Sequence, residues 1–333
     1  MPETARAKIT ALGAYVPPRV LTNQDLEKIV ETTDQWILER TGIRERHVAD
    51  KGIAASDLAV EAVKNLVKSH PMDLQEIDLI VVGTVTPDMM YPSTACLVQH
   101  KLGIHHTWGF DVSAGCSGFL YALNVGTEFI ESGRYRKVLV IGSDVNTSMV
   151  NYEDRAVCII FGDGAGAVLL EPANEGDDNV IVDHVAQVEG AGGAFLYMPG
   201  GGSLNPASPE TVAKKMHYIH QDGQQVFKYA VKKMAEMTER VLERNQLTGA
   251  DVDCFIAHQA NKRIITATAD RLKMPMEKVI INIDRYGNTT AGTIPLAMQS
   301  AVEEGKLKPG DTVLLAAVGA GFTSGATLLR WGF

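Results

Sequence analysis

The chain has 333 residues, of which 45% are hydrophobic and 21% charged, as in ordinary globular proteins and unlike disordered ones. Its formal net charge of −9 argues against general nucleic-acid binding, so an acidic partner would need a local basic patch. No apolar run approaches the length of a membrane span, and charges, Gly and Pro interrupt the opening "MPETARAKITALGAYVPP". We therefore expect no membrane insertion and no signal peptide, and we predict a cytoplasmic protein.

The first half of the chain alternates amphipathic helices with uniformly apolar strands. The stretch 56–70 carries apolar residues at helical spacing, with Ser56 as its predicted N-cap. "WGFDV" at 108–112 predicts a strand, "SGFLYALNVGTEFIESG" at 117–133 predicts a helix, and "KVLVIGS" at 137–143 predicts a second strand. Continuous apolar strands suit a sheet that is buried on both faces. The pattern predicts an α/β fold with a mainly parallel sheet covered by helices.

The second half of the chain repeats this order. Asp78 and Asp253 each enter an apolar strand and lie 175 residues apart, as do Lys137 and Thr312 at the start of a later strand. The polar stretch "EPANEGDDNV" at 171–180 separates the two halves. We predict two related units, residues 1–174 and 175–333, stacked in layers with helices shared between them.

The four cysteines have the spacing of neither a disulfide framework nor a zinc site. They are Cys96, Cys116, Cys158 and Cys254. Cys116 lies between the predicted strand 108–112 and the predicted helix 117–133, where the helix N-terminus would lower the pKa of a thiol and activate it as a nucleophile. A structural role explains an isolated cysteine equally well, and core packing is the better interpretation for the other three.

Two polar positions in the second half are further candidates for chemistry. His258 ends an apolar strand, where ligands gather in α/β folds, although a core histidine is the simpler interpretation. Asn288 lies in a loop rich in Gly, Asn and Thr and occupies the place in the second repeat that Cys116 has in the first. The pseudo-symmetry would bring Cys116 and Asn288 toward one site.

Two glycine-rich stretches differ in what they predict. The glycines of "GAGFTSG" at 319–325 follow a strand and suit a loop that offers backbone amides to an oxyanion. "FGDGAGA" at 161–167 lacks the G-x-G-x-x-G spacing and precedes a strand, so we exclude a dinucleotide site there.

Cys116 occurs together with "HQAN" at 258–261, "GNTTAG" at 287–292 and "GAGFTSG" at 319–325. With this set the sequence resembles, over essentially its whole length, the β-ketoacyl-acyl-carrier-protein synthase III family of thiolase-fold condensing enzymes. The resemblance implies an α/β, thiolase-like fold of two pseudo-symmetric halves in α-β-α-β-α layers. It also implies decarboxylative Claisen condensation of an acyl-CoA primer with malonyl-acyl carrier protein, which initiates fatty acid biosynthesis. No cofactor or metal is implied, since acyl-CoA is a substrate.

The resemblance also assigns roles to individual positions. The implied catalytic triad is Cys116, His258 and Asn288, and the implied oxyanion hole consists of the backbone amides of Cys116 and Ala320, the latter often Gly in the family. The implied coenzyme A contacts are Thr32, Trp36, Arg40, Arg155 and Asn261. The implied acyl pocket includes Phe161 and Tyr91, with Tyr91 reaching across a homodimer to close the partner's pocket. The implied carrier-protein docking patch is Lys228, Lys262 and Arg263.

Three other functions remain compatible with the sequence. A specialised paralogue of the same fold would use this triad to make a polyketide, quinolone or ketone precursor. A cysteine-dependent acyl-thioester hydrolase would use water as its second substrate. A non-catalytic acyl-binding paralogue is disfavoured because the triad is intact.

Overall fold

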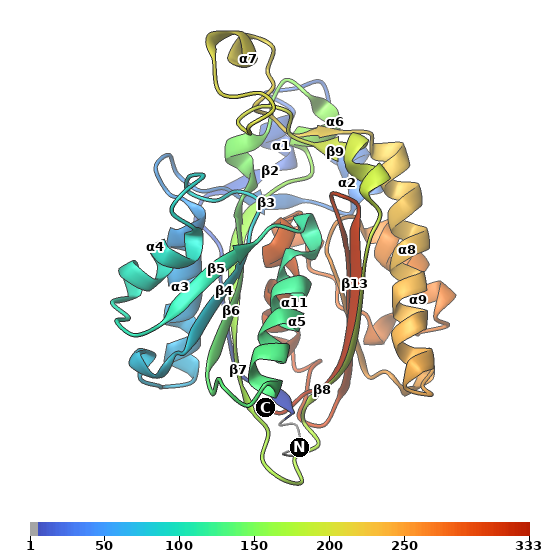
Figure 1. The fold of residues 1–333 in the computed structure, drawn as a ribbon. Coiled ribbons are helices and arrows are strands. Elements are labelled where there is room, and N and C mark those ends of the chain that lie inside the picture. The colour runs from blue at the N-terminus through green and yellow to red at the C-terminus, as the bar shows by residue number, and fades with distance from the viewer. Residues whose placement is uncertain (1–5) are drawn as a thin grey trace.

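Two β-sheets and three layers of helices make up the chain, which we describe from a computed structural model that covers residues 6–333 (Figure 1). The first sheet has the strand order β1-β7-β6-β4-β5, and the second has the order β11-β12-β13-β8. The first sheet consists of β1 (Ala7–Tyr15), β4 (Leu79–Gly83), β5 (Trp108–Val112), β6 (Val138–Val145) and β7 (Asp163–Pro172). The second consists of β8 (Ile181–Val188), β11 (Cys254–Ala257), β12 (Thr312–Gly319) and β13 (Thr323–Arg330).

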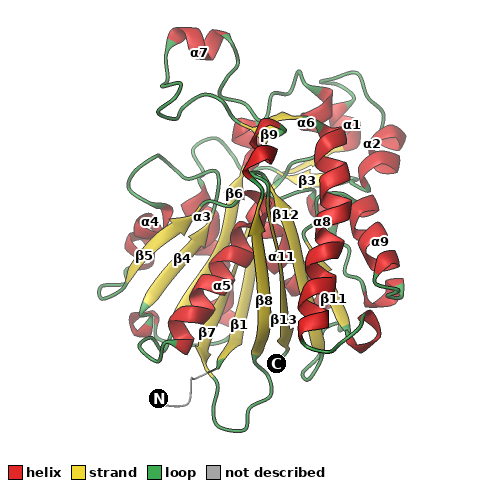
Figure 2. Cartoon of the chain, turned by 45° about the vertical axis from the view of Figure 1, so that its right-hand side comes forward, coloured by secondary structure: helices red, strands yellow, loops and turns green. Residues whose placement is uncertain are grey.

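Helices cover the outer face of each sheet and fill the space between the sheets (Figures 1 and 2). The outer layer of the first sheet is α3 (Ala55–Ser69) and α4 (Thr94–Leu102), and that of the second is α8 (Gly223–Arg244) and α9 (Lys262–Arg271). The central layer is α5 (Gly118–Glu131) and α11 (Thr293–Glu303). This is the α-β-α-β-α order expected from the sequence.

Short elements lie above the sheets in the view of Figure 1, where α7 stands clear of the other elements. The short helices are α1 (Asn23–Leu26), α2 (Asp34–Thr41), α6 (Arg155–Cys158), α7 (Pro209–Ala213) and α10 (Ile283–Tyr286). Two small sheets pair β2 (Val20–Thr22) with β3 (Glu45–His47), and β9 (Leu196–Tyr197) with β10 (His220–Gln221).

One hydrophobic core joins the two sheets through the central helices. It includes Val81 and Val140 of the first sheet, Phe119 of α5, and Ile256 and Leu315 of the second sheet, all fully buried. Because both sheets bury their inner faces against the same helices, neither half has an independent core on that side. The division of the chain at residues 174 and 175 stays a prediction.

The sheets are mixed, so the expectation of a mainly parallel sheet is wrong. Parallel pairing joins β4 to β5, β4 to β6 and β11 to β12, whereas the other four pairs within the two large sheets are antiparallel. Helical crossovers join the parallel strands in the usual way. The strand β13 follows β12 after only the turn 320–322, and such a short connection requires antiparallel strands.

The repeat of 175 residues recurs in the backbone hydrogen bonds. The backbone N–H of Asp78 donates to Lys137 O at 2.9 Å, and the N–H of Asp253 donates to Thr312 O at the same distance. The carboxylates of Asp78 and Asp253 accept in return from the N–H groups of Lys137 and Thr312, both at 3.0 Å. The two halves therefore fix the starts of equivalent strands in the same way.

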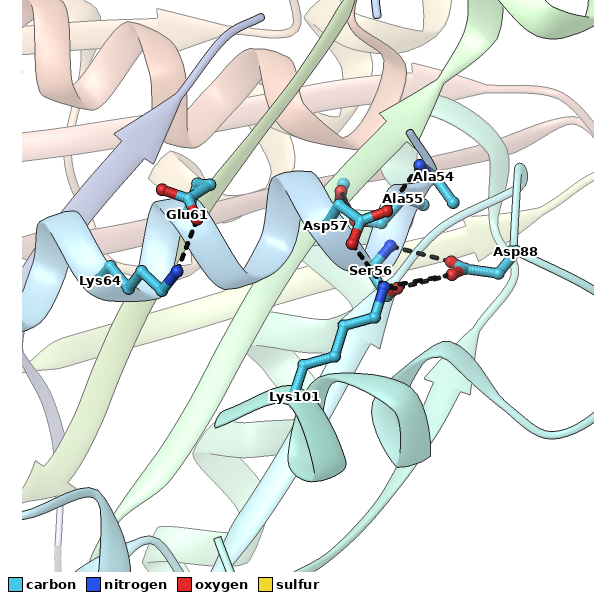
Figure 3. A network of polar contacts seen from close by, with 9 residues as sticks. Ala54, Ala55, Ser56, Asp57, Glu61, Lys64, Asp88 and Lys101 are labelled. Carbon is cyan, nitrogen blue, oxygen red and sulfur yellow. Dashed lines mark hydrogen bonds and ion pairs between the residues drawn. The ribbon is translucent and has the colours of Figure 1, made fainter. Parts of the chain in front are cut away.

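Ser56 does not cap its helix, contrary to expectation. The helix α3 begins two residues earlier than predicted, with Ala54 at the N-cap position, and Asp57 accepts a hydrogen bond from Ala54 N at 2.9 Å. Ser56 instead binds Asp88 through its backbone N–H at 2.9 Å and its hydroxyl at 2.6 Å, and Lys101 of α4 joins this network (Figure 3). These contacts anchor the loop 84–93 to the start of α3.

Glycines let both central helices approach the first sheet. A Cβ on Gly83 of β4 would lie 2.5 Å from the carbonyl carbon of Gly118, at the start of α5. A Cβ on Gly142, the neighbour of Gly83 across the β4–β6 pair, would lie 2.3 Å from the carbonyl oxygen of Ala291, just before α11. Only glycine at these two positions leaves room for the turns that precede the helices.

Gly83→Ala is expected to destabilise the protein by about 1–3 kcal/mol, because the new methyl group must displace the first turn of α5. Gly202→Ala is the matched control, since a Cβ there meets no atom within 4 Å. Denaturant unfolding of both variants measures the difference. Equal stability of the two variants would show that the helix start tolerates a side chain at position 83.

Candidate active site

Cys116 lies in a 3₁₀ turn, η2 (Gly115–Ser117), between β5 and α5. Gly115 has φ +56°, and a Cβ there would lie 2.5 Å from Ala320 N in the β12–β13 turn. A Cβ on Gly319 would lie 2.5 Å from Cys116 N. The two glycines therefore allow the turn that carries Ala320 to pack directly against the backbone of Cys116.

His258 follows β11 and is held in place by hydrogen bonds of its own backbone and of the neighbouring Gln259 side chain. Its backbone N–H donates to Ala316 O at 2.7 Å, and the side chain of the next residue, Gln259, donates to the carbonyls of Ala257 and Ile280. The imidazole Nδ1 lies 2.7 Å from Thr293 Oγ1, whereas the buried Nε2 has no hydrogen-bond partner among residues 6–333. Nε2 is thus the ring nitrogen left for a substrate.

Asn288 is held by its backbone and by its side-chain oxygen. Its N–H donates to Ile160 O and its carbonyl accepts from Gly162 N, both at 3.0 Å. Its Oδ1 accepts from Thr290 N at 2.9 Å, and its side chain is hydrogen-bonded to the Cys116 thiol. Since Oδ1 is engaged, the amide NH₂ is the group left to donate the hydrogen bond that lowers the pKa of the Cys116 thiol.

The structure brings Cys116, His258 and Asn288 to one cavity. All three are buried, with 8%, 1% and 5% of their surfaces exposed. Most of the other lining is apolar, including Phe161, Phe227, Ile264, Val318 and Phe322.

In the 175-residue repeat the position of Cys116 corresponds to Ala291 and not to Asn288, which lies three residues earlier. The two turns nevertheless meet at this cavity.

Burial makes the Cys116 thiol a weak acid, contrary to the expectation that the helix N-terminus would lower its pKa. Burial raises the pKa of Cys116 to about 12, and the charge of Asp144 adds to this effect. The hydrogen bond from Asn288 acts in the opposite direction. Removal of the thiolate from water therefore outweighs the favourable donors around it.

Burial acts on His258 in the opposite sense and keeps the imidazole neutral. Loss of solvation lowers its pKa from 6.5 to about 3. A neutral imidazole has one N–H donor and one acceptor nitrogen, so at neutral pH His258 is able to donate a hydrogen bond without carrying a charge.

The carboxylate of Asp144 links the first sheet to the loop of Asn288. It is fully buried, and burial raises its pKa to about 6 against the effect of its hydrogen bonds. One oxygen accepts from the hydroxyls of Thr84 and Thr86, and the other accepts from Ala291 N at 2.9 Å. This connection ties the end of β6 to the turn η7 (Thr290–Gly292).

Among the predicted coenzyme A contacts, Trp36, Arg40 and Arg155 lie together, and Asn261 connects them to the cavity. The guanidinium carbons of Arg40 and Arg155 lie 4.5 and 4.9 Å from the centre of the Trp36 ring. Asn261, which lines the cavity, donates from its side chain to Arg40 O at 2.8 Å. Thr32 precedes the helix α2 that carries Trp36 and Arg40, and its buried hydroxyl has no partner within the described chain.

The two acyl-pocket candidates occupy different places. Phe161 is buried between the catalytic cavity and a second, largely apolar cavity lined by residues such as Val85, Met149 and Ile219. Tyr91 lines neither cavity, and 86% of its surface is exposed. It lies in the loop 84–93 that Asp88 anchors to α3.

The predicted docking residues lie on the exposed N-terminal turns of α8 and α9. Lys228 belongs to α8, and Lys262 and Arg263 begin α9. The Arg263 guanidinium lies 5.1 Å from the ring centre of Phe227, which lines the cavity. Arg263 thus lies close to a residue of the cavity wall.

No sequence pattern predicted that Thr293 and Phe322 belong to the site. Thr293 contacts His258 across 35 positions of the chain, and Phe322 stacks on Tyr229 with ring centres 4.0 Å apart while lining the cavity. "GNTTAGT" and "GAGFTSG" contain both residues, but no local pattern shows which side chains from distant segments they meet.

Comparison with known proteins decides the family. A β-ketoacyl-[acyl-carrier-protein] synthase III of Koribacter versatilis is 76% identical over 333 residues, which is the full length of both chains. The chain belongs to the β-ketoacyl-[acyl-carrier-protein] synthase III family. It is therefore an acyltransferase, a condensing enzyme that initiates fatty acid biosynthesis.

Other comparisons agree with this assignment to the synthase III family. The synthase III of Solibacter usitatus is 58% identical over 329 residues, covering 98% of this chain and 99% of the relative. The models for 3-oxoacyl-[acyl-carrier-protein] synthase III and for its C-terminal part match residues 110–190 and 242–331. The crystal structure of 3-oxoacyl-[acyl-carrier-protein] synthase III from Aquifex aeolicus VF5 is 43% identical, with a TM-score of 0.89 over 98% of this chain and all of the other. The predicted thiolase-like α/β fold is confirmed.

In the part of the chain that the structure describes, no helix is long and apolar enough to cross a membrane. Among the same residues, no group of three or more His, Cys, Asp or Glu side chains is arranged to hold a metal ion.

Alkylation of Cys116 in the substrate-free enzyme is expected to be slow at neutral pH. With a pKa of about 12, only about one molecule in 10⁵ holds the thiolate at pH 7, and the rate should rise about tenfold per pH unit without a plateau up to about pH 9. Iodoacetamide labelling with peptide mass spectrometry measures the rate. A plateau below about pH 8 would mean that the helix terminus outweighs burial.

Proposed function

We propose that the cavity condenses an acyl-CoA primer with malonyl-acyl carrier protein, with Cys116 as nucleophile and His258 and Asn288 as hydrogen-bond donors. The observation that carries the proposal is the convergence of one thiol, one neutral imidazole and one amide NH₂ in a single buried cavity. The condensation needs these three types of group. We also propose that the enzyme works in the cytoplasm.

In the first half-reaction, Cys116 attacks the acyl-CoA carbonyl. The bond from Sγ to the carbonyl carbon forms, the bond to the coenzyme A sulfur breaks, and the thiol proton ends on that sulfur. The backbone amides of Cys116 and Ala320 would stabilise the oxyanion, which the close packing of their two turns supports. Because the thiolate and not the thiol is the nucleophile, Cys116 must give up its proton in the complex with acyl-CoA, and that proton leaves with coenzyme A.

In the second half-reaction, the malonyl thioester loses carbon dioxide to form an enolate. His258 Nε2 and the Asn288 amide would donate hydrogen bonds to the enolate oxygen. Neutral donors stabilise this charge without protonating the carbanion, which the lowered pKa of His258 supports. The carbanion then attacks the acyl-Cys116 carbonyl, Sγ leaves as a thiolate, and a proton from water restores the thiol.

The surroundings of the cavity support the two substrate roles. Trp36, with the guanidinium groups of Arg40 and Arg155 close to its ring, would offer aromatic surface and positive charge to the adenine and phosphates of coenzyme A. Thr32 and Asn261 would add polar contacts. Lys228, Lys262 and Arg263 would bind the acidic carrier protein beside the entrance.

We propose a homodimer in which Tyr91 and Phe161 complete each acyl pocket. Tyr91 and Met90 are 86% and 74% exposed, and large apolar groups on one loop are typical of surfaces that another chain covers. β5, at the edge of the first sheet, carries Trp108 with 47% of its surface exposed. An unpaired edge with exposed aromatic surface is open to pairing with a second copy.

The identity of 76% to a synthase III over the full chain supports fatty acid synthesis over a specialised paralogue. A hydrolase would need a base to activate water, and the neutral, weakly basic His258 is poorly suited to that role.

To test the function, the enzyme is mixed with acyl-CoA, with and without malonyl-acyl carrier protein. We expect an acyl group on Cys116 and, with the second substrate, a β-ketoacyl thioester. Free carboxylic acid as the main product, or acyl label on exposed Cys96, would contradict the proposal.

His258→Ala and Asn288→Ala are expected to separate the half-reactions. Each removes one donor to the enolate oxygen, so malonyl decarboxylation should fall by about 10²–10³. Acylation of Cys116 from acyl-CoA should stay within about tenfold of the wild-type rate, because the oxyanion amides remain. Stopped-flow acylation and carbon dioxide release measure the two steps. A variant that decarboxylates at the wild-type rate would show that the replaced residue is not an enolate donor.

Arg263→Glu is expected to raise the KM for malonyl-acyl carrier protein severalfold, because it places a negative charge where an acidic partner docks. Acylation by acyl-CoA should change little, and added salt should weaken carrier-protein binding in the wild type. Lys273→Glu, a change of the same charge beyond the far end of α9, is the control. If both variants behave alike, the carrier protein docks elsewhere.

A further inference from the structure

The hydroxyl of Thr293 lies between two groups that are both able to accept its hydrogen. Oγ1 is 2.7 Å from His258 Nδ1 and 3.1 Å from Thr290 O. Thr293 begins α11, and both Thr293 and His258 are almost completely buried, with 2% and 1% of their surfaces exposed. A hydroxyl has one hydrogen, so it donates to only one of the two groups at a time.

This choice sets which nitrogen of the neutral imidazole carries the hydrogen. If the hydroxyl donates to Thr290 O, then Nδ1 must donate to Oγ1, and Nε2 is left as an acceptor. If the hydroxyl donates to Nδ1, then Nε2 carries the hydrogen and faces the cavity as a donor. Oγ1 is the only partner of Nδ1 among the described residues, so the contact with Thr293 governs the tautomer.

The distances favour donation to the ring. A hydroxyl that donates to an oxygen most often lies about 2.7–2.8 Å from it, so the 3.1 Å contact with Thr290 O is long for such a bond. The 2.7 Å contact with His258 Nδ1 is in turn shorter than the usual distance of about 2.9–3.0 Å for a ring N–H that donates to an oxygen. The carbonyl of Thr290 lies one turn back on the same helix start, where the alternative bond is a weak local one. Nε2, buried and without a partner in residues 6–333, then points its hydrogen at incoming substrate.

We propose that Thr293 is a positioning residue that donates its hydroxyl hydrogen to His258 Nδ1 and so fixes Nε2 as the donor that meets the malonyl thioester oxygen. The donation from Nε2 to the malonyl thioester oxygen rests on the function proposed above. One consequence is that His258 does not remove the proton of Cys116, since its neutral form has no free acceptor nitrogen toward the cavity. His258 therefore serves decarboxylation and not acylation.

The tautomer is measured directly by ¹⁵N NMR of the whole enzyme labelled at histidine, without substrate and near pH 7. The signals of His258 are those lost in His258→Gln. We expect Nε2 to be the protonated nitrogen and Nδ1 the unprotonated one. A protonated Nδ1 in the wild-type enzyme would overturn the proposal, whatever the catalytic activity.

Three variants test the functional consequence. Thr293→Val keeps the shape and loses the hydroxyl, so malonyl decarboxylation should fall about tenfold to a hundredfold while acylation of Cys116 stays within about threefold. Thr293→Ser restores the donor and should stay within about threefold of wild type in both steps. Thr238→Val is the control, because Thr238 is a buried α8 residue whose hydroxyl also bonds the carbonyl three residues back, far from the site.

Each outcome has one meaning. Wild-type decarboxylation by Thr293→Val, or a loss in Thr293→Ser as large as that in Thr293→Val, overturns the proposal, because the effect then does not depend on the hydroxyl. If Thr293→Val does not fold, the NMR result and Thr293→Ser still decide. Failure of the wild-type enzyme to decarboxylate malonyl-acyl carrier protein would refute the proposed function, while the tautomer measurement stays valid.

Discussion

Removal of water from the cavity is the constraint on which the chemistry of this enzyme depends. The same burial raises the pKa of the Cys116 thiol to about 12 and lowers that of His258 to about 3, so both groups are neutral across the physiological range. In the proposed reaction, a neutral thiol would be protected from unwanted reactions in the resting enzyme, and a neutral imidazole would donate a hydrogen bond without delivering a proton to a carbanion. The low polarity that makes these groups poor acids and bases also strengthens each hydrogen bond to an enolate or oxyanion.

The backbone builds this buried cavity from the turns before α5 and α11 and from the turn between β12 and β13. The turns before α5 and α11 lie on the paired glycines Gly83 and Gly142 of the first sheet, and the β12–β13 turn packs against Cys116 through Gly115 and Gly319. Asp144 holds the turn after Asn288 in place by accepting a hydrogen bond from Ala291 N. Close approach of backbone to backbone leaves little space for water, and it places amide groups beside the sulfur. The same packing explains why the site needs both halves of the chain.

Much of this arrangement could be predicted from the sequence. The strand 108–112, the central helix after it and the 175-residue repeat follow from local periodicity, and the motifs around Cys116, His258 and Asn288 point to one site. Strand direction could not be predicted so well, because the antiparallel strands β7 and β13 are buried over nearly their whole length, as parallel strands in a covered sheet are. Ser56 has the residue type and position of an N-cap, yet a distant carboxylate, Asp88, takes its hydroxyl.

Protonation states, and contacts between segments far apart along the chain, could not be predicted from the sequence. A cysteine before a helix suggests an activated thiolate, but the pKa depends on how completely neighbouring segments exclude water, and this is known only once the chain is folded. The contact of Thr293 with His258 likewise joins two segments whose spacing along the chain carries no signal. The roles of the coenzyme A and carrier-protein contacts stay predictions that the geometry supports.

The central claim, that burial keeps His258 neutral, is tested most directly by NMR titration of its imidazole in the intact enzyme, with the signal assigned through His258→Gln. The account predicts that the His258 shifts stay constant from about pH 8 to about pH 5, because a pKa of about 3 lies below this range. A titration with a midpoint near the ordinary histidine value of 6.5 would contradict it, since His258 would then be a solvated base beside Cys116.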